Sequence, residues 1–293
     1  MAVLGKLMVA GLGGLGGLTG VLYASTVLSD TKTVVQASQK ISNLKNKRFE
    51  TDYNGSYEPA ITKWDFNWDR RDPSSMVSPS KGGEDDIRHK RDLTIVEPKA
   101  VRHLLLIRHG QYNIDGNTDK EMVLTKKGVE QAKLTGKRLV TLNFPYTKMM
   151  RSTMTRAQQT ADHILSQMKP GAFPISDDKM LEEGAPYPPE PSVYGYDPLD
   201  YEFFQDGSRI EAAFRNHVYR ADFRQLQDSY DIIVCHGNVI RYFVCRALQL
   251  PPEAWLRMDL RHGSITWLSV WPNGLVSLRC LGDSGHFPPD LLT

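Results

Sequence analysis

Two histidines directly follow apolar runs of the kind found in buried strands. Catalytic side chains often lie at this position, just after the carboxyl end of a strand. Residues 104–107 form the first run, which ends at Arg108 and His109, and residues 231–235 form the second, which ends at His236. A glycine follows each histidine and, because it lacks a Cβ, lets backbone N–H groups approach a bound anion. The sequence therefore marks His109 and His236 as candidate functional residues.

Arginines accompany these histidines and indicate the ligand. Arg108 precedes His109, and Ser152 and Arg156 follow a predicted strand at residues 147–151. Guanidinium groups repel metal cations, but they match phosphate oxygens bidentately. A neutral imidazole can attack phosphorus, and positive charge around it stabilises the oxygens in transfer. The pattern predicts a phosphorylated substrate, with no metal and no cofactor.

Most of the other histidines are expected to be structural. At least five of the eight in the chain are assigned surface or packing roles, and the candidates are His89, His103, His163, His217, His262 and His286.

A cysteine mechanism is the main enzymatic alternative. Cys235 and Arg241 have the cysteine-x5-arginine spacing of cysteine-dependent phosphatases, within a predicted strand, loop and helix. However, Asn238 stands where such a loop needs glycine, and residues 239–240 are apolar, as on the buried face of a helix. Cys235 is therefore interpreted as a small apolar residue at a strand end.

The elements that must position these residues alternate between strands and helices. Thr125 is a predicted N-cap. Predicted helices cover residues 126–140, 154–168, 208–226 and 239–250, and a hairpin covers residues 264–271 and 275–281. This alternation predicts an α/β fold with a mainly parallel central sheet, helices on both faces and functional residues at the carboxyl ends of the strands.

Charge and cysteine content argue against two classes of protein. The chain has 36 basic and 34 acidic side chains, so its formal net charge of +2 gives no reason to expect nucleic acid as a partner. The three cysteines, Cys235, Cys245 and Cys280, are too few and too far apart for a disulfide scaffold or a four-ligand zinc site.

The amino-terminal segment differs in composition from the rest. Residues 7–29 carry no charge, and as a helix at about 1.5 Å per residue they would span a hydrocarbon core of about 30 Å. Only Lys6 precedes the run, and no small-x-small cleavage site closes it, so we expect an uncleaved transmembrane anchor. Residues 30–99 have the composition of a stalk, and residues 100–293 form the predicted catalytic domain.

One segment of the stalk is rich in aromatic residues. Residues 64–71 begin with Trp64, Asp65, Phe66, Asn67, Trp68 and Asp69 and end with two arginines. Exposed aromatic side chains at this density usually need a surface to dock on. We expect docking on a target that the sequence leaves open; the alternative is that these side chains merely cover the adjacent domain.

Four motifs, in the expected order, resemble the histidine phosphatase (phosphoglycerate mutase) superfamily over residues 101–281. They comprise residues 106–110, 124–132, 152–161 and 236–237. Further segments are similar to a mitochondrial branch whose members are membrane-anchored serine/threonine protein phosphatases. These segments are residues 64–71, 183–186, 209–216 and 238–242.

The resemblance implies a role for each matching residue. His109 would be the nucleophile that becomes phosphohistidine, and Arg108, Arg156 and His236 would hold the phosphoryl oxygens. Glu183 would protonate the leaving oxygen and then activate water, so its pKa is expected to be raised by desolvation. No metal is implied.

The resemblance also implies partners and a location. It implies phosphoprotein substrates and a single-pass anchor in a mitochondrial membrane, outer or inner. It further implies a homo-oligomer in which residues 64–69 dock on a neighbouring copy and activate it. Gln111 and residues 181–184 depart from the mutase pattern, so mutase activity is not expected. A small-molecule phosphomonoesterase and a membrane-bound interaction scaffold on the phosphatase fold remain alternatives.

Overall fold

The computed structural model describes residues 63–293. The predicted anchor at residues 7–29 and the first part of the stalk lie outside the described residues. Within residues 63–293, no helix is long and apolar enough to cross a membrane.

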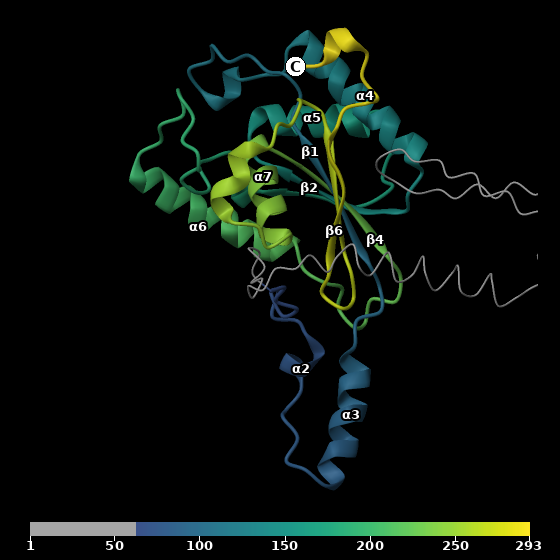
Figure 1. The fold of residues 1–293 in the computed structure, drawn as a ribbon. Coiled ribbons are helices and arrows are strands. Elements are labelled where there is room, and N and C mark those ends of the chain that lie inside the picture. Colours follow the sequence, from purple (N-terminus) through teal and green to yellow (C-terminus); the bar gives the residue numbers. More distant parts are fainter. Residues whose placement is uncertain (1–62) are drawn as a thin grey trace, which may run out of the picture. The chain divides into compact units, whose positions relative to one another are not determined.

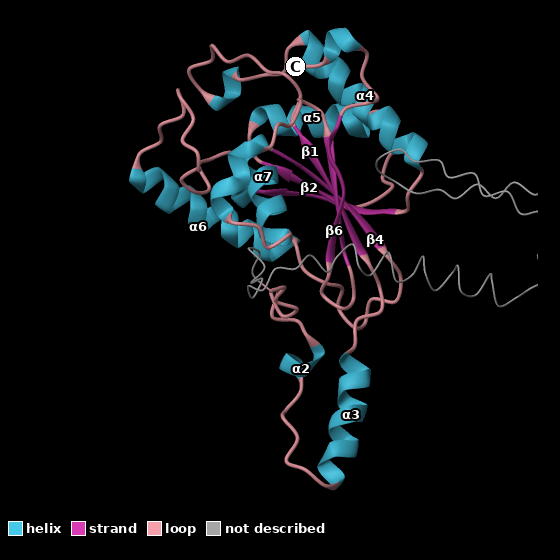
Figure 2. Ribbon diagram, viewed as in Figure 1, coloured by secondary structure: helices cyan, strands magenta, loops and turns pink. Residues whose placement is uncertain are grey.

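A six-stranded mixed sheet forms the centre of the α/β domain, in the order β3-β2-β4-β1-β5-β6. Figure 2 shows the strands in magenta with helices around them. The strands are β1 (Arg102–Arg108), β2 (Tyr146–Ser152), β3 (Ile175–Asp178), β4 (Ser229–Cys235), β5 (Ile265–Val270) and β6 (Val276–Asp283). The first four pair in parallel, as predicted, and the carboxyl-terminal hairpin adds two antiparallel strands. Strand β3 was not predicted, because its sequence Ile-Ser-Asp-Asp has no apolar run.

Helices cover both faces of the sheet (Figure 1). Helices α4 (Lys126–Leu142) and α5 (Thr155–Leu165) pack on one face, and α6 (Asp200–His217) and α7 (Gly237–Ala247) pack on the other. Thr125 caps α4 as predicted, since its hydroxyl accepts a hydrogen bond from the Gly128 amide at 3.1 Å.

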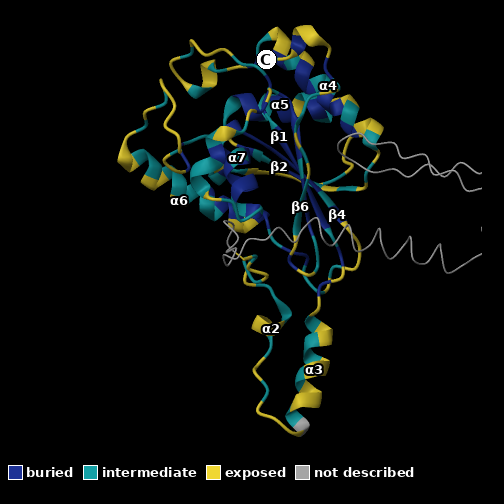
Figure 3. Ribbon diagram, in the orientation of Figure 1, coloured by how far each residue is buried: buried dark blue, intermediate teal, exposed yellow. Residues whose placement is uncertain are grey.

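Strand β1 supplies core residues to both faces. Leu104 and Leu106 belong to the cluster under α6 and α7, whereas Leu105 and Ile107 belong to the cluster under α4 and α5. All four are fully buried, which contributes about 1.5–3 kcal/mol for each side chain (Figure 3). The continuous apolar run thus reflects a strand that is covered on both sides.

Helix α6 differs from its predicted range of residues 208–226. It begins at Asp200, where the Glu202 side chain accepts a hydrogen bond from the Leu199 amide at 2.7 Å. It ends at His217, because the backbone becomes extended at Val218 and the Arg220 amide donates to the Asp69 carboxylate instead of a helical carbonyl.

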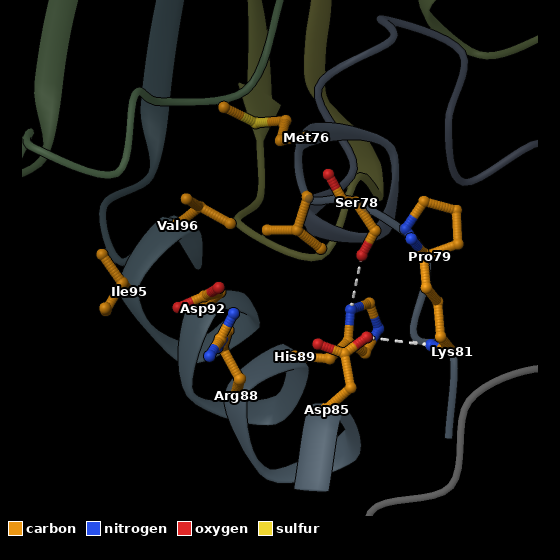
Figure 4. A pocket seen from close by; sticks show the side chains of 11 residues that line it. Met76, Ser78, Pro79, Lys81, Asp85, Arg88, His89, Asp92, Ile95 and Val96 are labelled. Atoms are coloured by element: carbon orange, nitrogen blue, oxygen red, sulfur yellow. Dashed lines mark hydrogen bonds between the residues drawn. The ribbon is translucent and has the colours of Figure 1, made fainter. Parts of the chain in front are cut away.

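Part of the predicted stalk is helical, contrary to expectation. Helices α2 (Pro73–Met76) and α3 (Glu84–Val96) form a hairpin before β1. The charged residues that suggested a linker lie on α3, since lysine, arginine and glutamate are good helix formers. The two helices and the loop between them line a partly open pocket of about 580 Å³. In this pocket, His89 Nδ1 lies 2.9 Å from the Ser78 carbonyl (Figure 4).

The tryptophan-rich segment packs on the α/β domain of its own chain. The indole N–H groups of Trp64 and Trp68 both donate to the Gly274 carbonyl, at 3.3 and 2.8 Å. The Trp68 ring also lies 5.9 Å from the ring of Phe214 on α6. The segment therefore covers the adjacent domain of its own chain, and docking on another protein stays a prediction.

A buried ion pair fixes this segment. The Asp69 carboxylate lies 2.9 Å from Arg220, and the two side chains are 2% and 0% exposed. Arg220 also donates to the Phe66 carbonyl. A fully buried guanidinium is stable only with such partners.

Substitution of Asp69 is expected to destabilise the protein. Asp69→Asn removes the closer of the two carboxylates beside Arg220 and leaves only Asp72, 3.6 Å away and partly exposed, so it should lower the free energy of unfolding by about 3 kcal/mol, measured by denaturant titration. Asp65→Asn, the same change at an exposed position of the segment, is the control and should cost less than about 0.5 kcal/mol. Equal values for the two variants would contradict the stabilising role of the ion pair.

Candidate active site

The predicted catalytic side chains converge at the carboxyl edge of the sheet. His109 follows β1, Arg156 lies in the first turn of α5, and His236 lies between β4 and α7. The parallel pairing of β1 with β4 places Arg108 opposite Cys235, so the next residues, His109 and His236, are neighbours. Their ring centroids are 5.1 Å apart, and Arg156 Nε lies 3.3 Å from His109 Nε2.

The backbone around His109 is fixed by hydrogen bonds. The His109 amide donates to the Cys235 carbonyl at 3.0 Å, and the Gly110 amide donates to the Thr160 hydroxyl at 2.9 Å. A Cβ at Gly110 would lie 2.5 Å from the Gly128 carbonyl oxygen, so the loop passes close to α4 only because residue 110 is glycine.

The contacts of His109 define its reactive nitrogen. Nδ1 lies 2.9 Å from the Gly110 carbonyl, which can only accept, so Nδ1 carries the proton. Nε2 then has a lone pair and faces Arg156. Burial lowers the pKa of His109 well below its usual value, and the neighbouring His236 and Arg156 lower it further. The ring is therefore neutral at pH 7 and available as a nucleophile.

His236 is held by a hydrogen bond to the neighbouring strand β2. Its Nε2 lies 2.8 Å from the Ser152 hydroxyl at the end of β2, and both side chains are fully buried. Burial, followed by the charge of Arg156, lowers its pKa well below the usual value. His236 is thus a second neutral imidazole beside His109.

Several buried polar atoms around His109 have no hydrogen-bond partner within residues 63–293. They include Arg108 Nε, Arg156 Nη1 and His236 Nδ1. Each unsatisfied buried donor costs about 1–3 kcal/mol, so such a group needs a ligand to justify it. Helices α5 and α7 also direct their amino ends toward the cluster, which favours an anion. The arrangement is that of a prepared phosphate site.

Glu183 lies beside this cluster, in the loop before α6. Its Oε1 accepts from the Gly184 amide at 3.2 Å, and its Oε2 lies 3.5 Å from the Asn238 amide. Burial raises the pKa of Glu183, and its effect exceeds the opposing effects of the hydrogen bonds and of Arg156 and Arg108. The direction is the one expected from the sequence.

Two aromatic residues of the site were not predicted. The Tyr112 and His262 rings lie 5.1 and 5.5 Å from the His109 ring, and Arg156 lies over Tyr112 at 4.7 Å. Burial, with the charge of Arg108, lowers the pKa of His262 to about 4. His262 precedes β5, which is antiparallel to β1, so its amino end reaches the carboxyl edge of β1. Sequence reasoning considered only strand carboxyl ends and therefore treated His262 as structural.

The structure disfavours the cysteine alternative. Cys235 is fully buried in the core, and burial raises the pKa of its thiol far above the usual value. A catalytic cysteine needs a lowered pKa and access to solvent. Arg241, the arginine of the cysteine-x5-arginine spacing, donates a hydrogen bond to the side-chain oxygen of Asn238 at 3.2 Å.

The tryptophan-rich segment does not contribute to this cluster. It contacts Gly274, which lies in the turn between β5 and β6. The paired residues Val270 and Val276 flank this turn. Val270 pairs with Arg102 at the start of β1, so this turn lies at the edge of the sheet opposite His109. Within the described part of the chain, no group of three or more histidine, cysteine or acidic residues could hold a metal ion.

These features define a histidine-centred phosphate site on an α/β fold. A family model described as the histidine phosphatase superfamily (branch 1) matches residues 104–282, and the chain belongs to this superfamily.

Individual proteins with known names are also similar to this chain. A protein of Xenopus tropicalis named serine/threonine-protein phosphatase PGAM5, mitochondrial, is 55% identical over 81% of this chain and 86% of its own length. The Homo sapiens protein of the same name is 50% identical over 82% of this chain and 83% of its own. Among solved structures, a phosphoglycerate mutase of Plasmodium falciparum covers 65% of this chain and 96% of its own, with 32% identity and a TM-score of 0.46.

Proposed function

We propose that this protein is a membrane-anchored protein phosphatase that hydrolyses phosphoserine and phosphothreonine through a phosphohistidine on His109. The observation that carries the proposal is the unprotonated Nε2 of His109 among buried polar atoms that have no hydrogen-bond partner within residues 63–293. The names of the relatives, serine/threonine-protein phosphatases, support a protein substrate.

The reaction proceeds in two displacements. His109 Nε2 attacks phosphorus, the bond from phosphorus to the serine or threonine oxygen breaks, and protonated Glu183 gives its proton to that oxygen. Water then attacks the phosphohistidine, Glu183 takes a proton from it, and the N–P bond breaks to release phosphate. Arg108, Arg156 and His236 hold the phosphoryl oxygens throughout.

The relatives' names support a mitochondrial location. The uncharged run at residues 7–29 supports a single-pass anchor, which would hold the phosphatase domain at a mitochondrial membrane, outer or inner.

An acid-stability test addresses the mechanism. Rapid quenching with a labelled phosphoserine peptide should leave acid-labile, base-stable label on the wild-type protein. His109→Ala should lose this label and at least about 10³-fold of the activity, since the nucleophile is missing. Cys235→Ser, a change of one buried atom nearby, should keep most of both. Loss of labelling in Cys235→Ser and not in His109→Ala would disprove the histidine mechanism.

The leaving group tests Glu183. In a single turnover, Glu183→Gln should slow peptide release from phosphoserine by about 10²–10⁴-fold, because an alkoxide needs a proton to leave. Phenol release from an aryl phosphate should slow much less. Since the pKa of Glu183 is raised and its protonated form is required, the wild-type rate with phosphoserine should fall as pH rises through that pKa. Equal losses with both substrates would remove Glu183 from the acid role.

We also propose that the protein forms a homo-oligomer through its tryptophan-rich segment. The tryptophan-rich segment already fits a site on the catalytic domain, and only the α2–α3 hairpin connects the segment to β1. A change in that connection lets the segment occupy the same site on a neighbouring copy. A membrane anchor raises the local concentration of such copies.

Light scattering and turnover test assembly together. A protein beginning after residue 30 should form oligomers, and Trp64→Ala with Trp68→Ala should reduce both its size and its turnover. Leu226→Ala, an exposed apolar residue outside the segment, is the control and should change neither. A wild-type protein that is a fully active monomer would contradict the assembly proposal.

A further inference from the structure

The loop that carries Glu183 has little regular structure of its own. It follows a short 3-10 helix, η2 (Lys179–Leu181), and ends before α6. Among residues 63–293, the Glu183 carboxylate has two hydrogen bonds, one of 3.2 Å from the adjacent Gly184 amide and one of 3.5 Å from the backbone amide of Asn238. The position of the carboxylate therefore depends on what holds the loop backbone.

One guanidinium on α6 holds this backbone. Arg209 Nη1 donates to the carbonyls of Met180 and Glu182, at 3.1 and 2.5 Å, and Nη2 donates to the carbonyl of Glu183 at 3.0 Å. A surface arginine that served only an ion pair would direct its donors to a carboxylate. Arg209 also donates to three carbonyls, and these bonds hold the loop at Glu183 and on its amino-terminal side.

Asp206 completes the arrangement from the other side. Its Oδ1 accepts from Arg209 Nη2 at 2.8 Å, and its Oδ2 accepts from the Ala185 amide at 3.0 Å. Since Asp206 and Arg209 lie one helical turn apart, α6 holds the loop both before and after Glu183.

The contact requires glycine at residue 184. A Cβ there would lie 2.4 Å from Asp206 Cγ and 2.6 Å from Arg209 Nη2. The loop can therefore lie this close to the two side chains only without a side chain of its own.

We infer that Arg209 and Asp206 are positioning residues that hold Glu183 where it can protonate the leaving oxygen. The inference rests on the proposed acid role of Glu183. A misplacement of about 1 Å can cost about 10²-fold in rate, so loosening the loop should affect the proton transfer more than the attack by His109. The backbone of His109 and Gly110 is held separately, since the His109 amide donates to the Cys235 carbonyl and the Gly110 amide donates to the Thr160 hydroxyl.

The test uses full-length protein and the single-turnover release of two leaving groups. Arg209→Lys keeps the charge, but its single ammonium nitrogen has three donors and cannot replace two guanidinium nitrogens that make four hydrogen bonds, to three carbonyls and to Asp206. It should slow release from a phosphoserine peptide by about 10–100-fold and release from an aryl phosphate by less than about threefold. Arg215→Lys, the same change on the same helix at a side chain that is 70% exposed, is the matched control and should alter neither rate.

Two further variants make the outcome decisive. Asp206→Asn should also slow release from the phosphoserine peptide more than release from the aryl phosphate, with a smaller loss of rate than Arg209→Lys. Adding Arg209→Lys to Glu183→Gln should slow release no further than Glu183→Gln alone. Selective loss in Glu183→Gln without selective loss in Arg209→Lys and Asp206→Asn would overturn this inference and leave the acid role intact. Equal loss on both substrates in Glu183→Gln would overturn the acid role and the inference with it.

Discussion

The arrangement of the site depends on one constraint, the burial of a neutral imidazole among guanidinium groups. His109, His236 and Arg156 are nearly or fully buried, and Nε of Arg108 and Nη1 of Arg156 have no hydrogen-bond partner within residues 63–293, although Asp119 lies 3.7 Å from Arg156 Nη1. Such a cluster is costly without an anion, so a rigid frame must hold it together. The frame is the parallel pair β1 and β4, whose carboxyl ends place the two histidines side by side.

Burial has opposite consequences for the two proton-active groups. It lowers the pKa of His109, the proposed nucleophile, and the neighbouring His236 and Arg156 lower that pKa further, so the ring is unprotonated. Burial raises the pKa of Glu183 by more than the arginines lower it. A base and an acid can therefore exist at one pH within one pocket. This balance makes the exact placement of the Glu183 loop important.

Helix α6 contacts both the loop of Glu183 and the tryptophan-rich segment. Arg209 bonds the loop, and Phe214, further along the same helix, packs on Trp68. Just beyond the helix, Arg220 forms the buried ion pair with Asp69. The segment lies at the edge of the sheet opposite His109, so any influence of docking on catalysis has a physical route along α6.

The sequence by itself determined the elements that have a strong local signal. The apolar runs of β1 and β4, the cap at Thr125 and the paired arginines and histidines predicted the parallel part of the sheet and the phosphate site at its edge. Tertiary structure decided what local patterns do not encode. The antiparallel hairpin brought His262 to the site, and Arg209 and Asp206 on α6 bonded the Glu183 loop through backbone atoms that no sequence pattern reveals. It also placed the tryptophan-rich segment on its own domain, because the partners Arg220 and Gly274 lie far away in the chain.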